Sequence, residues 1–176
     1  MREQATILAE AREYIKAKNL EFAGSDYYID EQIALKAITF ISLLRHTGGK
    51  LAGRPFALLP FQIKFIADII GTYDRRTANR RYKTALLFIP RKNGKTELIA
   101  ALLNYFLFVD SEKGKEIYCA ANETDQARII FNAATTMIAQ NSTLSKNCEI
   151  YKSTRSVVAK SEFQNFIIDI VFFQKK

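Results

Sequence analysis

The pattern that most restricts the fold is a short charged turn between two apolar runs. TALLFI at 84–89 is continuously apolar and too short for a helix, which is typical of a strand buried on both faces. After the turn, residues 95–108 predict a helix that is apolar nearly all round. EIYCAA at 116–121 predicts a second strand, and residues 125–140 predict an amphipathic helix capped by Thr124. Because strand and helix alternate, we expect an α/β domain with a parallel sheet.

Helical patterns precede this region. Residues 5–20 and 61–70 each place their apolar side chains on one stripe, as a helix requires. A further helix is expected to begin at the capping residue Asp30 and to stop at Gly48-Gly49, where glycine accepts a left-handed conformation. The polar, basic segment that follows the 61–70 helix predicts a surface loop.

Composition limits the class of protein. The 176 residues suit one domain with a lead-in, and 48% hydrophobic residues allow a sizeable core. Cys119 and Cys148 are too few for a disulfide framework or a zinc site. The N-terminus lacks the apolar core of a signal peptide, and the longest apolar stretch, 98–109, is too short to span a bilayer. We therefore expect an intracellular, soluble protein with no membrane partner.

Charge gives a weaker indication about partners. Lys and Arg total 26 against 18 Asp and Glu, a formal net charge of +8. Such a surplus favours a polyanionic partner, and a merely basic protein would show it equally well. The densest basic cluster lies in the loop before the first strand, where it would either follow a DNA backbone or remain a solvated loop. Its members are Arg75, Arg76, Arg80, Arg81 and Lys83.

The turn itself, IPRKNGKT at 89–96, fits most of the phosphate-binding pattern G-x-x-x-x-G-K-[ST], with Ile89 in place of the first glycine. Gly94 lets backbone N–H groups approach phosphate oxygens, and Lys95 brings an ammonium to the β and γ phosphates. The Thr96 hydroxyl is a ligand type that Mg²⁺ accepts, and the helix N-terminus favours anions. The alternative is an ordinary strand-to-helix loop.

PRKNGKTE is similar to the deviant Walker A motif of phage terminase large subunits, the ATP-driven motors that pack DNA into procapsids. That family commonly has a basic residue early in the loop, here Arg91, and lacks the leading glycine. The resemblance implies ATP and Mg²⁺ as cofactors, Lys95 and Arg91 as catalytic residues, and Thr96 as the metal ligand. The residues implied in nucleotide binding are Gln62, Pro90, Arg91, Lys92, Asn93, Gly94, Lys95 and Thr96.

Two further segments resemble the same family, so that the resemblance covers roughly residues 27–145. HTGGKLAGRPFALLPFQ at 46–62 looks like the adenine-side motif, in which Gln62 would bond the base; otherwise Gln62 is a polar residue on the exposed side of its helix. GKEIYCAANETDQARIIFNAATTMI at 114–138 looks like the second strand and helix. The family implies a P-loop NTPase-type parallel sheet flanked by helices.

The resemblance also implies an organisation and a set of partners. We expect a helical lead-in over 1–55, the N-terminal half of the ATPase domain over 56–150, and an incomplete or divergent tail over 151–176. Double-stranded phage DNA, a small terminase subunit and a portal are the implied partners, in the cytoplasm of a bacterial host. Homo-oligomers are expected for the complete protein only.

The chain departs from the family in its last part. Hydrolysis in this class needs an apolar strand ending in Asp-Glu, and the nearest candidate is FIIDIVFF at 166–173, where Ile170 follows Asp169. KSTRSVVAKSEFQ at 152–164 predicts the start of a hairpin, and no nuclease domain follows. We therefore expect an N-terminal fragment, from a prophage or by truncation, with an incomplete sheet and doubtful turnover.

Other functions stay open at this point. Another P-loop enzyme, such as a helicase or a nucleotide kinase, would share the turn. A non-catalytic DNA-binding or prophage-remnant protein would act through the basic cluster at 75–83. His46 has no Asp, Cys or second His at ligand spacing, so a structural role is expected for it.

Overall fold

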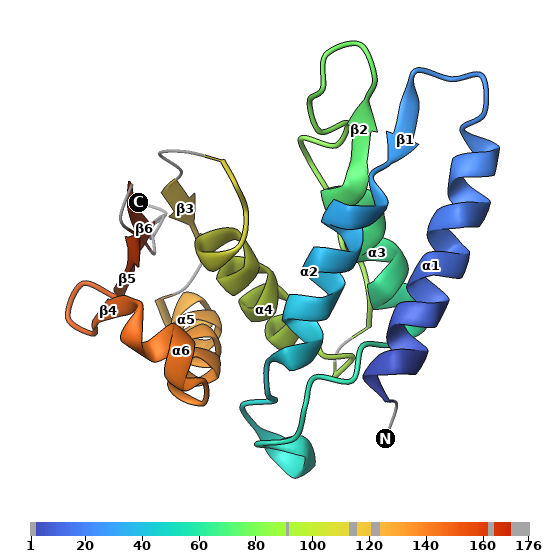
Figure 1. The fold of residues 1–176 in the computed structure, drawn as a ribbon. Coiled ribbons are helices and arrows are strands. Elements are labelled where there is room, and N and C mark those ends of the chain that lie inside the picture. Colours follow the sequence, from blue (N-terminus) through green and yellow to red (C-terminus); the bar gives the residue numbers. More distant parts are fainter. Residues whose placement is uncertain (1–2, 91, 113–115, 121–123, 162–163, 170–176) are drawn as a thin grey trace. The chain divides into compact units, whose positions relative to one another are not determined.

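The structure, a computed structural model, describes residues 3–90, 92–112, 116–120, 124–161 and 164–169 (Figure 1). The chain divides into two compact units. The first comprises Met1–Leu43 and Pro55–Ile89, and the second comprises Leu44–Arg54 and Pro90–Lys176. The segment between residues 44 and 54 therefore belongs to a different unit from the helices on either side of it.

Helices α1 (Gln4–Glu21), α2 (Glu31–Leu43) and α3 (Pro60–Gly71) pack against one another in the first unit (Figure 1). The expected helices at 5–20 and 61–70 are confirmed. Asp30 caps α2 as expected, since its Oδ1 accepts a hydrogen bond from the N–H of Ile33 at 3.0 Å. The expected end of α2 at Gly48-Gly49 is wrong, because the helix already stops at Leu43.

A short ribbon joins two distant parts of the first unit. Strand β1 (Tyr27–Ile29) pairs antiparallel with β2 (Thr72–Asp74), which follows α3 directly. A Cβ on Gly71 would lie 2.8 Å from the Cβ of Ala34 and 2.9 Å from Cγ2 of Ile29. Glycine is therefore required where α3 passes into the ribbon, because backbone and neighbouring side chains approach too closely for any other residue.

Residues 84–89 do not form the predicted buried strand. The structure assigns them no strand, and the side chains of Leu86 and Phe88 are 88% and 93% exposed. A strand persists only when its backbone groups pair with a neighbour, and the strands of the described sheets pair with one another instead. The prediction of a buried strand at 84–89 is therefore wrong, because an apolar run becomes a buried strand only where a partner strand lies alongside.

In the second unit, α4 (Lys95–Phe108) and α5 (Thr124–Ala139) pack together, and α4 also contacts strands of the sheet (Figure 1). Both helices were predicted within one residue of these bounds. Asn104, the one polar interruption in the apolar face of α4, is buried and donates its side-chain N–H to the Ala134 carbonyl at 3.1 Å. It therefore fixes the register between the two helices.

The described residues of the second unit contain a four-stranded sheet in the order β3-β6-β5-β4. Its strands are β3 (Glu116–Tyr118), β4 (Cys148–Tyr151), β5 (Ser156–Ser161) and β6 (Gln164–Asp169). β3 and β6 are parallel, whereas β4, β5 and β6 pair antiparallel. The hairpin expected to start within 152–164 is confirmed. The P-loop-type parallel sheet is not present among these strands, and β3 ends before the expected residue 121.

Two short helices complete the second unit. The 3₁₀ helix η1 (Gly49–Leu51) lies in the segment that precedes Arg54, and α6 (Ser142–Lys146) follows α5. Asn141 caps α6, because its side-chain oxygen accepts from the N–H groups of Thr143 and Leu144. Across the residues that the structure describes, no helix combines the length and the apolarity needed to cross a membrane.

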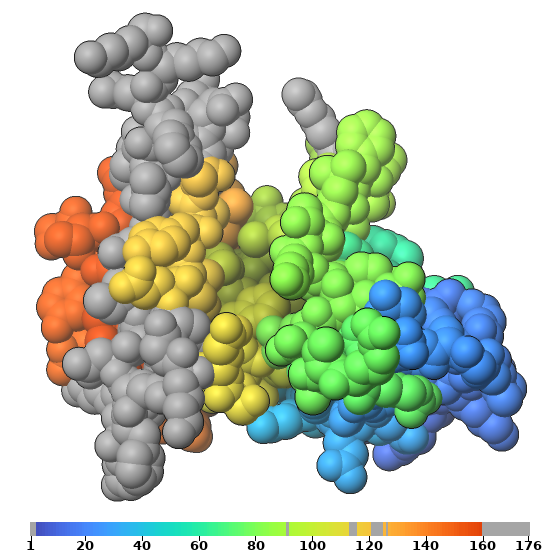
Figure 2. Space-filling view, turned by 90° about the horizontal axis from the view of Figure 1, so that it is seen from above, coloured from blue at the N-terminus to red at the C-terminus, as the bar shows by residue number. Residues whose placement is uncertain are grey.

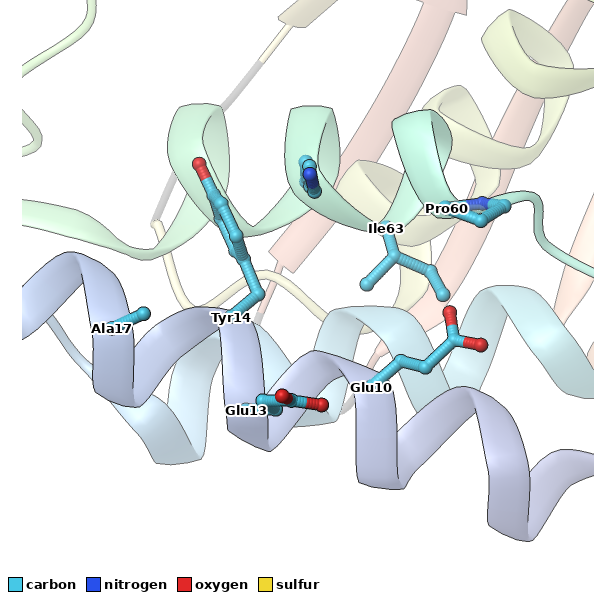
Figure 3. Close-up of a pocket in the computed structure, with 7 residues that line it drawn as sticks. Glu10, Glu13, Tyr14, Ala17, Pro60 and Ile63 are labelled. Atoms are coloured by element: carbon cyan, nitrogen blue, oxygen red, sulfur yellow. The ribbon is translucent and has the colours of Figure 1, made fainter.

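A pocket of about 290 Å³ opens between α1 and α3 within the first unit. Figure 3 shows Glu10 and Tyr14 reaching from α1 toward α3, where Pro60 and Ile63 lie, and Glu13 of α1 also lines the pocket. At one side of it, the Tyr14 hydroxyl donates to both carboxylate oxygens of Asp68 on α3, at 2.8 and 2.9 Å. Burial and this hydrogen bond raise the pKa of Tyr14, and burial raises the pKa of Asp68.

We expect replacement of exposed Phe88 by Ser to change the free energy of unfolding by no more than about 0.5 kcal/mol. Phe56 in the same unit is only 2% exposed, and Phe56→Ala should cost about 3–5 kcal/mol through the cavity it leaves. Urea unfolding of both variants measures the difference. A comparable loss in the two would mean that residues 84–89 are packed, contrary to the structure.

Tyr14→Phe should lower the free energy of unfolding by about 1–2 kcal/mol near pH 7, because it removes the hydrogen bond to Asp68. The raised pKa means that Tyr14 keeps its proton in the folded chain while the unfolded chain loses it from about pH 10. The advantage of the wild type should therefore be constant from neutral pH to about pH 10 and shrink above it. Tyr27→Phe, which keeps the ring beside Arg81, serves as control. A gap between the wild type and Tyr14→Phe that does not change with pH would contradict the linkage.

Candidate nucleotide-binding site

The turn before α4 has the backbone conformation that an anion site needs. Lys92 and Gly94 both have positive φ, at 69° and 72°, and α4 begins at Lys95. The Gly94 carbonyl accepts the first helical hydrogen bond, from the N–H of Leu98 at 3.0 Å. Gly94, at the N-cap, has no side chain that could cap α4, and the N–H groups at the start of a helix are the donors that bind phosphate oxygens in P-loop sites.

Two side chains of the turn converge on one carbonyl. Nζ of Lys95 donates to the Pro90 carbonyl at 3.0 Å, and Nδ2 of Asn93 donates to the same oxygen at 3.3 Å. The ammonium of Lys95 therefore lies across the turn and does not extend into solvent. Arg91, expected to reach the γ phosphate, lies outside the described residues. The other predicted residues of the turn, from Pro90 to Thr96, are brought together.

Thr96, the predicted metal ligand, is half-buried in the first turn of α4. In the parts of the chain that the structure describes, no three His, Cys, Asp or Glu side chains gather into a metal cluster. Mg²⁺ does not need one, because it is usually held by one or two protein oxygens together with substrate phosphates and water. The donor set at the turn, one hydroxyl at the N-terminus of a helix, fits that chemistry.

Gln62 lies in the first unit, in the opening turn of α3. Its side chain is only 4% exposed, so the alternative of a solvent-facing polar residue is wrong. Oε1 accepts the N–H of Leu59 at 2.9 Å and thereby caps α3 from within. This bond fixes the orientation of the carboxamide, and it gives Gln62 a structural role that the sequence did not indicate.

The basic segment at 75–83 also lies in the first unit, next to residues of the N-terminal part (Figure 2). The Arg75 guanidinium stands over the Tyr28 ring at 4.7 Å, and that of Arg81 over the Tyr27 ring at 4.0 Å. Nε of Arg76 lies 3.7 and 4.0 Å from carboxylate oxygens of two aspartates. Those residues are Asp26 and Asp74. Several of these cations therefore hold the ribbon and its surroundings together.

His46 and Glu97 form a contact that the sequence pattern did not reveal. Nδ1 of His46 lies 3.4 Å from Oε2 of Glu97, the residue directly after Thr96. The same carboxylate accepts the N–H and the hydroxyl of Thr47, although Thr47 and Glu97 are 50 positions apart. The structural role expected for His46 agrees with this. The sequence did show that Glu97 directly follows the Gly-Lys-Thr motif, which marks its carboxylate as a residue of interest. Its partners, His46 and Thr47, were not predictable from spacing.

The comparisons with known proteins agree with one another. A family model described as the ATPase domain of the terminase large subunit matches residues 60–172, so it continues past residue 145, where the resemblance was expected to end. The large terminase subunit of Enterobacteria phage HK97 is 36% identical over 111 residues, which are 62% of this chain and 21% of that protein. The chain thus spans about a fifth of the length of this relative.

A solved structure is similar as well. The crystal structure of the HK97 bacteriophage large terminase aligns with a TM-score of 0.68 and 28% sequence identity, over 81% of this chain and 28% of that one. The family model spans well over half of the chain and contains both the turn at Pro90–Thr96 and Gln62. The chain therefore belongs to the family of phage terminase large subunits, and residues 60–172 lie in its ATPase domain.

Proposed function

We propose that this chain binds ATP with Mg²⁺ through the deviant Walker A turn PRKNGKT, as part of a motor that packages double-stranded phage DNA. The observation that carries the proposal is the turn itself: a left-handed Gly94 opens α4, and the Lys95 ammonium is folded across the loop. Family membership supports the class of reaction, which is ATP hydrolysis coupled to DNA movement.

The phosphates would lie on the backbone N–H groups at the start of α4. The Pro90 carbonyl that now accepts from Lys95 carries only a partial charge, so a β or γ phosphate oxygen would compete for the ammonium with a stronger, charge-assisted bond. Asn93, which shares that carbonyl, would keep the loop closed during the exchange. Lys92 and Arg91 add positive charge to the same turn.

Thr96 would hold the metal ion through its hydroxyl, and the bound ion would supply charge neutralisation between the β and γ phosphates. Arg91 would stabilise the charge that develops on the γ phosphate, the role that the resemblance implies for it. Gln62 would recognise the adenine base through its Nε2 donors, because Oε1 is already used by the N–H of Leu59. These assignments make Lys95 and Arg91 the catalytic residues.

Hydrolysis would need a carboxylate that orients the attacking water. Asp169 ends β6, which lies parallel to β3 in the sheet, and the residue after it, Ile170, has no carboxylate for this step. The proposal made for these residues is therefore nucleotide binding.

Double-stranded DNA is the proposed polyanionic partner, because the whole chain has a formal net charge of +8. The basic segment at 75–83 would contact it. We further propose that the complete protein forms homo-oligomers in the host cytoplasm and assembles there with a small terminase subunit and a portal. The second candidate function, DNA binding without nucleotide, is favoured by the same cluster, in which Arg75 and Lys83 are exposed.

Lys95→Ala should weaken binding of a fluorescent ATP analogue in the presence of Mg²⁺ by about 10- to 100-fold, since it removes charge-assisted bonds to the phosphates. Equilibrium titration by fluorescence anisotropy measures the change. Lys146→Ala, which removes an exposed lysine of the same charge from α6, is the matched control and should keep the wild-type affinity. Equal affinity for the wild type and Lys95→Ala would refute the site assignment.

Lys83→Ala should reduce the slope of log K against log salt for duplex DNA by about one, as loss of one phosphate contact predicts. Lys146→Ala again serves as control and should leave the slope unchanged. Salt-dependent DNA binding that is indifferent to ATP and to Lys95→Ala would favour the second candidate function. An unchanged slope for Lys83→Ala would remove this residue from the proposed DNA surface.

A further inference from the structure

The segment 46–54 is a closed loop with its own hydrogen bonds. At its base, the N–H of His46 donates to the Arg54 carbonyl at 2.9 Å, and the N–H of Gly53 donates to the His46 carbonyl at 2.8 Å. Within the loop, Gly49 and Gly53 have φ of 67° and 76°, which allows the chain to turn back on itself. A loop whose two ends are joined in this way moves largely as one body.

One carboxylate attaches this loop to the nucleotide-binding turn. The Thr47 N–H lies 3.2 Å from each oxygen of Glu97, and the Thr47 hydroxyl also donates to Oε1. Nδ1 of His46 faces the other oxygen at 3.4 Å. A second attachment runs to the end of α5, where Nε2 of Gln140 donates to the His46 carbonyl at 3.4 Å.

The position of Glu97 gives these contacts a functional meaning. It follows Lys95 and Thr96 in the first turn of α4, where a negative charge is favourable for the helix but unfavourable for a nearby triphosphate. The half-buried Glu97 carboxylate accepts two hydrogen bonds from Thr47 and contacts the His46 ring, so its position is fixed by the loop. A change in the loop would therefore alter how the Glu97 carboxylate is held at the first turn of α4.

We propose that Thr47 and Glu97 are a positioning pair that couples loop 46–54 to the nucleotide-binding turn. The loop holds Glu97 in place, Glu97 fixes the first turn of α4, and bound nucleotide in turn stabilises the loop. Coupling of this kind is reciprocal, because an element that raises the affinity for a ligand is itself ordered by that ligand. The inference rests on the proposed function for its nucleotide, whereas the attachment of the loop does not.

The attachment is tested without nucleotide by hydrogen exchange of the backbone amides in 46–54. Thr47→Val keeps the shape but removes the hydroxyl, and we expect exchange in the loop to rise by about tenfold. Thr47→Ser restores the hydroxyl and should restore wild-type exchange. Thr6→Val, at an exposed threonine of α1, is the matched control and should leave the loop unchanged. Equal exchange in the wild type and Thr47→Val would overturn the proposal.

The coupling is tested by affinity for the fluorescent ATP analogue with Mg²⁺ in a double-mutant cycle. Thr47→Val should weaken binding by about three- to tenfold in the wild type, and by much less when Glu97 is already replaced by Gln. Thr47→Ser should bind as the wild type does, and the analogue should slow exchange in 46–54 only where the hydroxyl is present. If Thr47→Val raises hydrogen exchange in 46–54 but leaves the affinity for the analogue unchanged, the contact only stabilises the loop, and the coupling is overturned.

The same experiments separate this proposal from the proposed function. If Lys95→Ala weakens binding as expected while Thr47→Val binds as the wild type does, the nucleotide site stands and the coupling is refuted. If the wild type and Lys95→Ala bind alike, the site assignment fails and the coupling fails with it, while the exchange measurement still reports on the attachment of the loop.

Discussion

The second unit depends on the way in which α4 begins. Gly94, at a φ of 72°, turns the chain so that a buried helix starts immediately behind a short polar loop. Burial of Leu98, Ala101 and Tyr105 anchors the helix, so its first turn is held rigidly although it carries charged and polar side chains. Rigid support of an exposed helix N-terminus is what an anion site requires, because the N–H groups must be oriented before the ligand arrives.

Helices were predictable from the sequence because their signals are local. The apolar stripe of α1, the Asp30 cap of α2 and the all-round apolar pattern of α4 each lie within one element, and the structure confirms them. Residues 84–89 were not predictable in the same way, since an apolar run states only that burial is favourable. Whether a strand forms depends on a partner, and the described strands pair among themselves. Phe88 is exposed because the apolar run has no partner strand beside it in the described residues.

The candidate site shows the same difference between local signals and tertiary contacts. Gly94, Lys95 and Thr96 are consecutive, so a motif identified them and the structure brings them together with Asn93. Gln62 was identified from the family resemblance, yet its burial and its bond to the N–H of Leu59 required the fold. The contact of Thr47 with Glu97 joins residues 50 positions apart and has no periodic signature. Spacing predicts the residues that act through one loop, and only tertiary structure shows the residues that support them.

The basic segment shows why charge alone predicts function poorly. Cζ of Arg81 lies 4.0 Å from the centroid of the Tyr27 ring, and a guanidinium above a ring keeps N–H groups at its edge for other acceptors, so aromatic and phosphate contacts can use different parts of one side chain. Arg76 differs, because its Nε faces two carboxylates, and a phosphate would have to displace that ion pairing. Exposed Lys83 is a flexible point charge that would need no such displacement to meet a phosphate. Within one basic run, the availability of each cation therefore depends on what it already contacts.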